Sequence, residues 1–280
     1  MNKTIPFGLT LWLFACLSAC VMPLSERITR AHALASEAGM TSRVFDGALP
    51  LQGFYRAGAP GDTLYIFIEG DGYAWVSPSQ PSRNPTPLTP LALQLAAADS
   101  ASSLLYLGRP GQYLGAVSQR YWTSARFAPE VVQAMAEAID AHRQAVASGP
   151  VVLVGYSGGA ALAALLAQRF LHSNSVEVVG LITVAGNLDV AYWVESQGLS
   201  PLTASLDPAT EASALAGLAQ RHLYGSRDTQ VPVAVLNSFL GQVGSRACIE
   251  TLSVDASHAG PWLPAWQDSR QNPLRCSEAE

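Results

Sequence analysis

Ser157 lies between Gly155 and Gly159 in the stretch VVLVGYSGG, at the end of an apolar run over residues 151–156. A serine acts as a nucleophile only where a substrate carbonyl can reach its Oγ, and a sharp turn from a strand into a helix exposes the side chain in this way. Such a turn crowds the backbone, so small residues are needed two positions before and after the serine. The alternative is a structural glycine-rich turn. The helical pattern that follows favours a nucleophile and directs the N–H of Gly158 toward a developing oxyanion.

A histidine and a carboxylate that could activate Ser157 follow it in the chain. His258 lies in the loop SHAGPW, and Asp228 lies in the turn YGSRDTQVP. His258 would accept the proton of Ser157 and return it to the leaving group, while Asp228 would fix the imidazole tautomer. Asp255 and Asp189 are alternative acids, because each also follows a predicted strand. The other four histidines lie in a tether, on helices or at a strand start, so we expect them to be structural.

The elements that position these residues alternate between strands and helices. Apolar runs predict strands at 63–69, 102–108, 151–156, 176–186, 221–225 and 248–254, and helical periodicity predicts helices at 88–99, 129–147, 159–171 and 231–243. A Pro/Ser-rich stretch at 76–90 predicts a loop. Continuous apolar strands that alternate with helices indicate a mostly parallel sheet covered on both faces, which is an α/β fold.

Composition limits the class of protein. The chain has 280 residues, of which 13% are charged, and a formal net charge of −5. This length suits one large α/β domain, and the absence of Lys/Arg clusters argues against nucleic-acid binding. The sequence contains no H-E-x-x-H, no C-x-x-C and no nucleotide-binding loop, so we expect neither a metal nor a cofactor.

The order serine, aspartate, histidine and the contexts of Ser157, Asp228 and His258 resemble the α/β-hydrolases. The segments FIEGDGYAW, GYSGGAALAALLA and TVAGNLDVAYW resemble a group of bacterial exported or lipoprotein hydrolases in that fold. The resemblance implies a second oxyanion donor after an early strand, where relatives often carry His-Gly. This chain has EGDG there, so the N–H of Asp71 is the expected donor and that of Gly72 is the alternative.

Four tryptophans follow predicted strands at the edge where open α/β sheets bind ligands: Trp75, Trp122, Trp193 and Trp262. We expect them to form an apolar pocket for an acyl or aryl group, although each could instead cover the core. The insertion at 187–219 is long enough for a small cap and too short for a large lipase lid. A small to medium ester is therefore the expected substrate.

The N-terminus has the pattern of a targeting segment. Lys3 is followed by an apolar stretch over residues 5–17, and LSAC ending at Cys20 resembles the lipobox of bacterial lipoproteins. An ordinary secretory signal and an uncleaved anchor helix are the alternatives. Val21 resembles the outer-membrane sorting pattern, which implies a lipid-anchored protein facing the periplasm. The predicted organisation is a signal peptide at 1–19, a tether with some helical tendency at 20–42 and a single domain with a short tail at 43–280.

Cysteine usage is consistent with export. If Cys16 leaves with the signal and Cys20 carries lipid, then Cys248 and Cys276 remain. An even number of cysteines in an oxidising compartment predicts a disulfide, and two free thiols are the alternative. Such a bond is expected to clamp the loop that bears His258, so that reduction would lower stability and activity together.

The sequence thus predicts a serine hydrolase that cleaves a carboxylic ester through an acyl-enzyme on Ser157. Its expected partners are a small-molecule ester and a membrane, the latter through Cys20. An acyltransferase or a thioesterase on the same triad is the nearest alternative. A non-catalytic envelope protein that kept the fold for binding is the alternative from another class.

Overall fold

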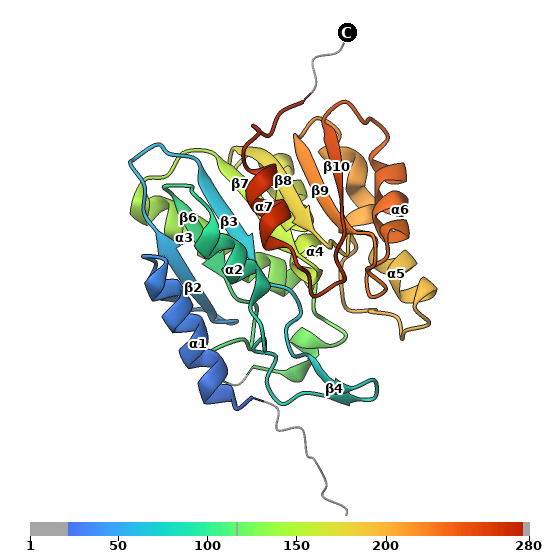
Figure 1. Ribbon diagram of the computed structural model, residues 1–280, viewed down its shortest axis with the longest axis horizontal. Helices are drawn as coiled ribbons and strands as arrows, with labels where there is room; N and C mark the ends of the chain where they lie inside the picture. The colour runs from blue at the N-terminus through green and yellow to red at the C-terminus, as the bar shows by residue number, and fades with distance from the viewer. Residues whose placement is uncertain (1–21, 116, 277–280) are drawn as a thin grey trace, which may run out of the picture.

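An eight-stranded sheet forms the centre of the molecule (Figure 1), and the computed structural model describes residues 22–115 and 117–276. The strands lie in the order β1-β2-β6-β3-β7-β8-β9-β10, and the six from β6 to β10 run parallel while β1 and β2 pair antiparallel. Their bounds are Thr41–Phe45 (β1), Leu51–Arg56 (β2), Leu64–Ile68 (β3), Leu104–Leu107 (β6), Val151–Tyr156 (β7), Val178–Val184 (β8), Gln220–Gly225 (β9) and Ile249–Val254 (β10).

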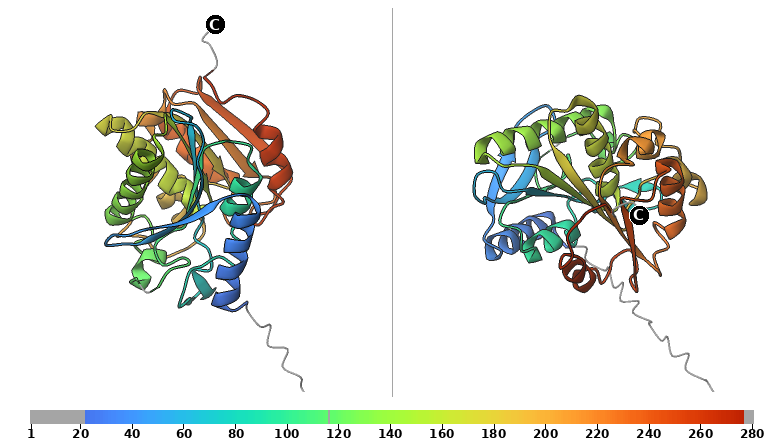
Figure 2. Two further views of the ribbon diagram at one scale, coloured as in Figure 1. Left: turned by 90° about the vertical axis from the view of Figure 1, so that its left-hand side faces the viewer. Right: turned by 90° about the horizontal axis from the view of Figure 1, so that it is seen from above.

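Helices cover both faces of this sheet (Figure 2). One face carries α1 (Leu24–Glu37), α2 (Leu91–Ala98) and α7 (Leu263–Ser269), and the other carries α3 (Pro129–Val146), α4 (Gly158–Ser173) and α6 (Val233–Val243). Side chains of β3 alternate between the two cores: Ile66 and Ile68 pack on the α3–α4 side, and Phe67 packs on the α2–α7 side. Burial on both faces explains why the central strands are continuously apolar. The predicted parallel α/β architecture is confirmed.

Part of the predicted tether belongs to the folded domain. Helix α1 buries Arg27, Ala31 and Ala35, which lie four residues apart and therefore share one helix face. The Nη1 of Arg27 donates to the carbonyl of Thr86 at 2.5 Å. The predicted tether with some helical tendency is helical over Leu24–Glu37 and packs against the domain, because small alanines on one face let α1 approach closely. The signal segment and Cys20 lie outside the described residues.

Shorter elements complete the fold. The predicted Pro/Ser loop contains a small hairpin of β4 (Trp75–Ser77) and β5 (Gln80–Pro81). The insertion after β8 contains α5 (Val190–Ser196) and a 3₁₀ segment, η2 (Pro208–Leu215), and a further one, η1 (Gln119–Trp122), follows β6. The sequence did not predict α7, whose Trp266 is fully buried and lies 5.5 Å from the ring of Phe67. In the described part of the chain, no helix combines the length and hydropathy needed to cross a membrane.

Cys248 and Cys276 are joined by a disulfide that ties the C-terminal segment to the beginning of β10. The buried Arg221 holds the same segment, since its Nη1 donates to the carbonyls of Ser269 at 2.5 Å and Asn272 at 3.2 Å. His258 follows the opposite, carboxyl end of β10. The disulfide therefore does not clamp the histidine loop directly, which corrects that part of the expectation.

Candidate active site

Ser157 lies in the tight turn between β7 and α4 with φ 54° and ψ −122°. An L-residue in this region of positive φ is strained, and such strain persists only where the surroundings hold it. The N–H of Ser157 donates to Val184 O at 2.9 Å, and the carbonyl of Ser157 accepts from Asn187 N at 3.1 Å. The turn is thus fixed by backbone bonds to the neighbouring strand β8 and the residues after it.

The glycines on either side of the serine are required by close approaches of the backbone. A Cβ at Gly155 would overlap the backbone of Ala160, and a Cβ at Gly159 would overlap the carbonyl oxygens of Ile68 and Glu69. Only glycine fits at either position. The expected reason for the pattern around Ser157 is therefore confirmed in the geometry.

His258 and Asp228 meet Ser157 at the carboxyl ends of the strands. The Nε2 of His258 lies 2.9 Å from Ser157 Oγ, and its Nδ1 lies 2.8 Å from Asp228 Oδ2. The second oxygen of Asp228 accepts from the N–H groups of Gln230 and Val231, both at 2.9 Å. Because the carboxylate is buried and held at both oxygens, it can orient the imidazole with Nε2 toward the serine.

The two alternative acids have other partners. Asp255 forms a surface ion pair with Arg227 at 2.6 Å. Asp189 caps α5 by accepting from Tyr192 N at 2.9 Å, and it also accepts from Ser238 Oγ at 2.6 Å. Neither contacts His258 in the described hydrogen bonds, so the structure brings together only Asp228 of the three candidates.

Two aromatic side chains hold the histidine loop. The carbonyl of His258 accepts from Tyr156 Oη and from Trp262 Nε1, each at 2.9 Å. The Tyr156 ring lies 5.4 Å from the imidazole, and Trp262 is buried. Trp262 was predicted to line the pocket, and that expectation was wrong. Its buried indole holds the loop through the carbonyl of His258. A role in backbone support leaves no pattern in the sequence.

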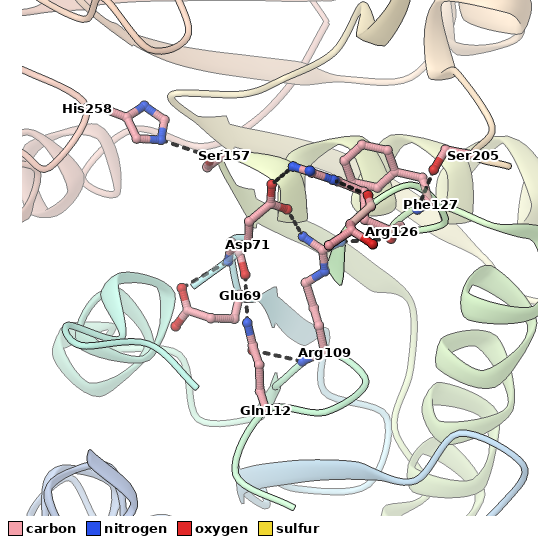
Figure 3. Close-up of polar contacts among 11 residues, drawn as sticks. Glu69, Asp71, Arg109, Gln112, Arg126, Phe127, Ser157, Ser205 and His258 are labelled. Carbon is pink, nitrogen blue, oxygen red and sulfur yellow. Dashed lines mark hydrogen bonds and ion pairs between the residues drawn. The ribbon is translucent and has the colours of Figure 1, made fainter. Parts of the chain in front are cut away.

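The loop after β3 carries Asp71 to the side of Ser157 (Figure 3). The carboxylate of Asp71 lies next to Gly158. Gly158 is the first residue of α4, so its N–H has no acceptor within the helix. Among the residues that the structure describes, the N–H of Asp71 has no acceptor either. Both donors were predicted, and both are free to bind an oxyanion. Whether Asp71 or Gly72 supplies the second bond stays a prediction.

The carboxylate of Asp71 is bound between two guanidinium groups, those of Arg109 and Arg126 (Figure 3). Burial alone would raise the pKa of Asp71, but the charges of Arg126 and Arg109 outweigh it and lower the pKa below its usual range. Asp71 is therefore an anion whose charge is satisfied by partners. No motif in the sequence pointed to these two arginines, which lie 38 and 55 residues from Asp71.

Glu69 and Gln112 hold the same loop from the side of the sheet. Glu69 is buried and accepts from Gly70 N at 3.0 Å and Tyr106 Oη at 3.1 Å. Burial raises the pKa of Glu69 to about 7, and the hydrogen bonds from Gly70 and Tyr106 oppose this rise. Gln112 Nε2 donates to the carbonyl of Gly70 at 2.9 Å. Glu69 thus orders the loop and does not face the serine as a second acid.

No protein-family model matches the sequence, and no curated protein is similar to it. Solved structures are similar. An α/β serine hydrolase homologue from Coxiella burnetii is 17% identical over 82% of this chain and 94% of its own, with a TM-score of 0.51. Est1E from Butyrivibrio proteoclasticus is 11% identical over 81% and 95%, with a TM-score of 0.58. An esterase from Pyrococcus furiosus is 14% identical over 84% and 91%, with a TM-score of 0.57. The chain has the α/β-hydrolase fold.

A cavity of about 1000 Å³ opens beside Ser157 on this α/β-hydrolase fold. Trp75 on β4 and Trp193 on α5 line it, as predicted. Trp122 does not: it is buried, and its Nε1 donates to Ser82 O at 3.2 Å, so that it supports the hairpin loop. The predicted aromatic lining is therefore confirmed for Trp75 and Trp193 and wrong for Trp122 and Trp262, which are buried.

The insertion after β8 forms one wall of the cavity through residues 199–202. Trp193 Nε1 donates to Gln230 O at 2.7 Å, and Leu206 N donates to Phe127 O at 2.9 Å. These bonds tie the insertion to the body, which fits a small cap. Within the described residues, no group of three His, Cys, Asp or Glu side chains could hold a metal ion.

Proposed function

We propose that the protein is a serine hydrolase that cleaves a carboxylic ester of small to medium size through an acyl-enzyme on Ser157. The observation that carries the proposal is the continuous hydrogen-bonded chain from Ser157 Oγ through His258 to the buried Asp228, with bonds of 2.9 and 2.8 Å. A serine is a weak nucleophile by itself and is activated by an adjacent base that a third group orients.

The reaction would run in two halves. His258 Nε2 takes the proton of Ser157 as Oγ attacks the ester carbonyl, and the oxyanion accepts hydrogen bonds from Gly158 N–H and Asp71 N–H. The tetrahedral intermediate collapses as His258 gives the proton to the departing alcohol. Water then attacks the acyl-enzyme with His258 again as base, which releases the carboxylic acid and restores Ser157.

The carboxyl group of Asp228 stabilises the imidazolium that forms in each half. Its Oδ1 already accepts two backbone N–H groups, which leaves Oδ2 alone for His258. The carboxylate therefore cannot turn away from the imidazole without losing both backbone bonds. This arrangement supports a histidine with a fixed tautomer.

The cavity supports an ester rather than a large polymeric substrate. Its volume of about 1000 Å³ is in the range of small-molecule pockets, and Trp75 and Trp193 offer apolar walls to an acyl or aryl group. Solved structures with the same fold include one named as an esterase.

We also propose that Cys20 carries a lipid anchor and that the protein faces the periplasm from a bacterial outer membrane. Helix α1 begins at Leu24, four residues after Cys20. Its Arg27 lies over the Tyr73 ring at 5.5 Å, and Tyr73 lines the cavity. Anchoring at Cys20 would therefore hold the face with the cavity near the membrane.

Labelling of the full chain with a fluorophosphonate probe tests the proposed reaction. The probe forms a phosphonyl ester with any activated serine, so the natural acyl group need not be known. We expect labelling of the wild type, loss of labelling in Ser157→Ala and full labelling in Ser173→Ala, a control at the other end of α4. A wild type that is folded by circular dichroism and does not react would contradict the proposal.

A further inference from the structure

Arg126 combines burial, charge and access to the cavity. The residue is 5% exposed and lines the cavity together with Ser157. Its Nε donates to Thr123 O at 2.9 Å, and its Nη1 pairs with Asp71. Among the described residues, the Nη2 of Arg126 has no hydrogen-bond partner, and this nitrogen is accessible to solvent. One guanidinium nitrogen is thus left with both protons available at the cavity wall.

Arg126 shares its counter-ion with a second arginine. Asp71 is ion-paired to both Arg126 and Arg109, and Glu69 acts electrostatically on Arg109 as well. The nearby Glu69 points to the opposite side of the loop, where it binds Gly70 and Tyr106. A buried guanidinium that shares a single carboxylate in this way is further stabilised by a ligand anion or by water that reaches it. The cavity wall at Arg126 is therefore suited to an anion.

The position of Arg126 is fixed by its own backbone. The carbonyl of Arg126 accepts from Arg109 Nη2 at 2.7 Å. The next residue, Phe127, donates its N–H to Ser205 Oγ at 3.1 Å and accepts from Leu206 N at 2.9 Å (Figure 3 shows the bond to Ser205). These bonds join the segment to the small cap. A guanidinium that is already held loses little entropy on binding a ligand.

We infer that Arg126 is a specificity-determining residue that binds an anionic group, a carboxylate or a phosphate, on the ester substrate. The inference rests on the proposed hydrolase and deepens it. Guanidinium N–H groups form charge-assisted hydrogen bonds to both kinds of anion, and these are stronger than neutral ones. The preferred substrates are then esters whose acyl or alcohol portion carries a negative charge that reaches the Arg126 wall while the carbonyl lies at Ser157.

A matched set of compounds tests this assignment on the full chain. The 4-nitrophenyl monoester of glutarate carries a terminal carboxylate, its methyl ester is neutral, and the corresponding phosphonate-terminated ester represents the phosphate class. Fluorophosphonates with a carboxylate or a methyl-ester tail give the same comparison through the rate of Ser157 labelling, without turnover. We expect kcat/KM and the labelling rate to favour one anionic form over the neutral form by about 10- to 100-fold.

The variants separate charge recognition from support of the loop. Arg126→Met should abolish the anion preference, and Arg126→Lys should retain part of it, because the charge stays while the planar fork is lost. Arg120→Met is the control, since Arg120 pairs with Glu130 on the surface. The ratio of anionic to neutral rates is the readout, because a general loss from a disturbed Asp71 lowers both rates equally.

Two results would overturn the assignment while the hydrolase proposal stands. The first is a wild-type ratio of anionic to neutral rates near one for both the carboxylate and the phosphonate. The second is a ratio that Arg126→Met leaves unchanged. A wild type that reacts with neither fluorophosphonate fails at the earlier step, since Ser157 is then not activated. Which anionic ester is preferred identifies the carboxylate or the phosphate as the recognised group.

Discussion

Gly158→Ala is a substitution whose effect can be worked out from the structure. A Cβ at this position would overlap Asp71 Oδ1 and lie 2.8 Å from Arg109 Nη1. The backbone at Gly158 is that of the first helical turn, so alanine itself is compatible with the local conformation. The added methyl group must therefore push aside the carboxylate that is bound to both arginines.

Overpacking of this kind costs about 1–3 kcal/mol in the free energy of unfolding. The effect on catalysis should be larger, because moving Asp71 also moves a predicted oxyanion donor. Loss of one such donor lowers kcat by roughly 10²- to 10³-fold. We therefore expect a modest fall in Tm and a rate of Ser157 labelling that is lower by at least two orders of magnitude.

The assay compares Tm, ester kcat and labelling rate in the wild type, Gly158→Ala and Gly241→Ala. Gly241 lies in α6, and a Cβ there meets nothing within 4 Å, so this control should be neutral or slightly stabilising. In a double-mutant cycle with Asp71→Ala, the two changes should cost less together than their sum, by about 0.5–3 kcal/mol. Gly158→Ala with wild-type Tm and labelling would refute the reasoning.

Three further predictions concern other parts of the molecule. Asp228→Asn should lower kcat by about 10⁴-fold with little change in Tm, because the imidazole loses its tautomer control, and a loss below tenfold would contradict this. The pKa of Glu69 is raised from 4.5 to about 7, so its protonated form favours the fold; that contribution is complete below pH 4.5 and is lost as the pH rises to 7. Urea titrations should show the wild type losing about 3 kcal/mol relative to Glu69→Gln over this range, and parallel curves would disprove it. The Cys248–Cys276 disulfide lies at the end of β10 away from His258, so its reduction should leave kcat at 25 °C unchanged, as measured by ester turnover. Reduction should still lower the free energy of unfolding by roughly 3–4 kcal/mol, as measured by calorimetry.

Features with a local cause could be predicted from the sequence. The turn at Ser157 needs glycines because of neighbours within a few residues and the adjacent strand, so its pattern is visible in the chain. Asp228 and His258 each follow a recognisable strand, which made their positions predictable. The choice between Asp228 and Asp255 was less secure, because both lie in loops at the same edge of the sheet and only the fold shows which carboxylate meets the imidazole.

Features that depend on distant contacts could not be predicted. The partners of Asp71 come from Arg109 and Arg126, and no spacing rule joins residues so far apart in the chain. Trp262 was placed wrongly for a different reason: its indole bonds the carbonyl of His258, four residues earlier, and a bond to the backbone leaves no pattern of residue types. Helix α1 was underestimated because its buried face consists of small side chains and one arginine, which carry little hydrophobic signal.

The two ends of the described chain leave the domain at opposite edges of the sheet (Figure 1). Near the N-terminal end, Arg27 lies over the ring of Tyr73, which lines the cavity. The C-terminal end is fixed by Cys276 at the start of β10. This polarity determines how the protein can be attached to a solid support. Coupling through the C-terminus would turn the cavity toward the bulk solution and leave it accessible, whereas coupling through the N-terminus would press the entrance against the surface. A biosensor or a flow reactor built on this protein should therefore use a C-terminal tag.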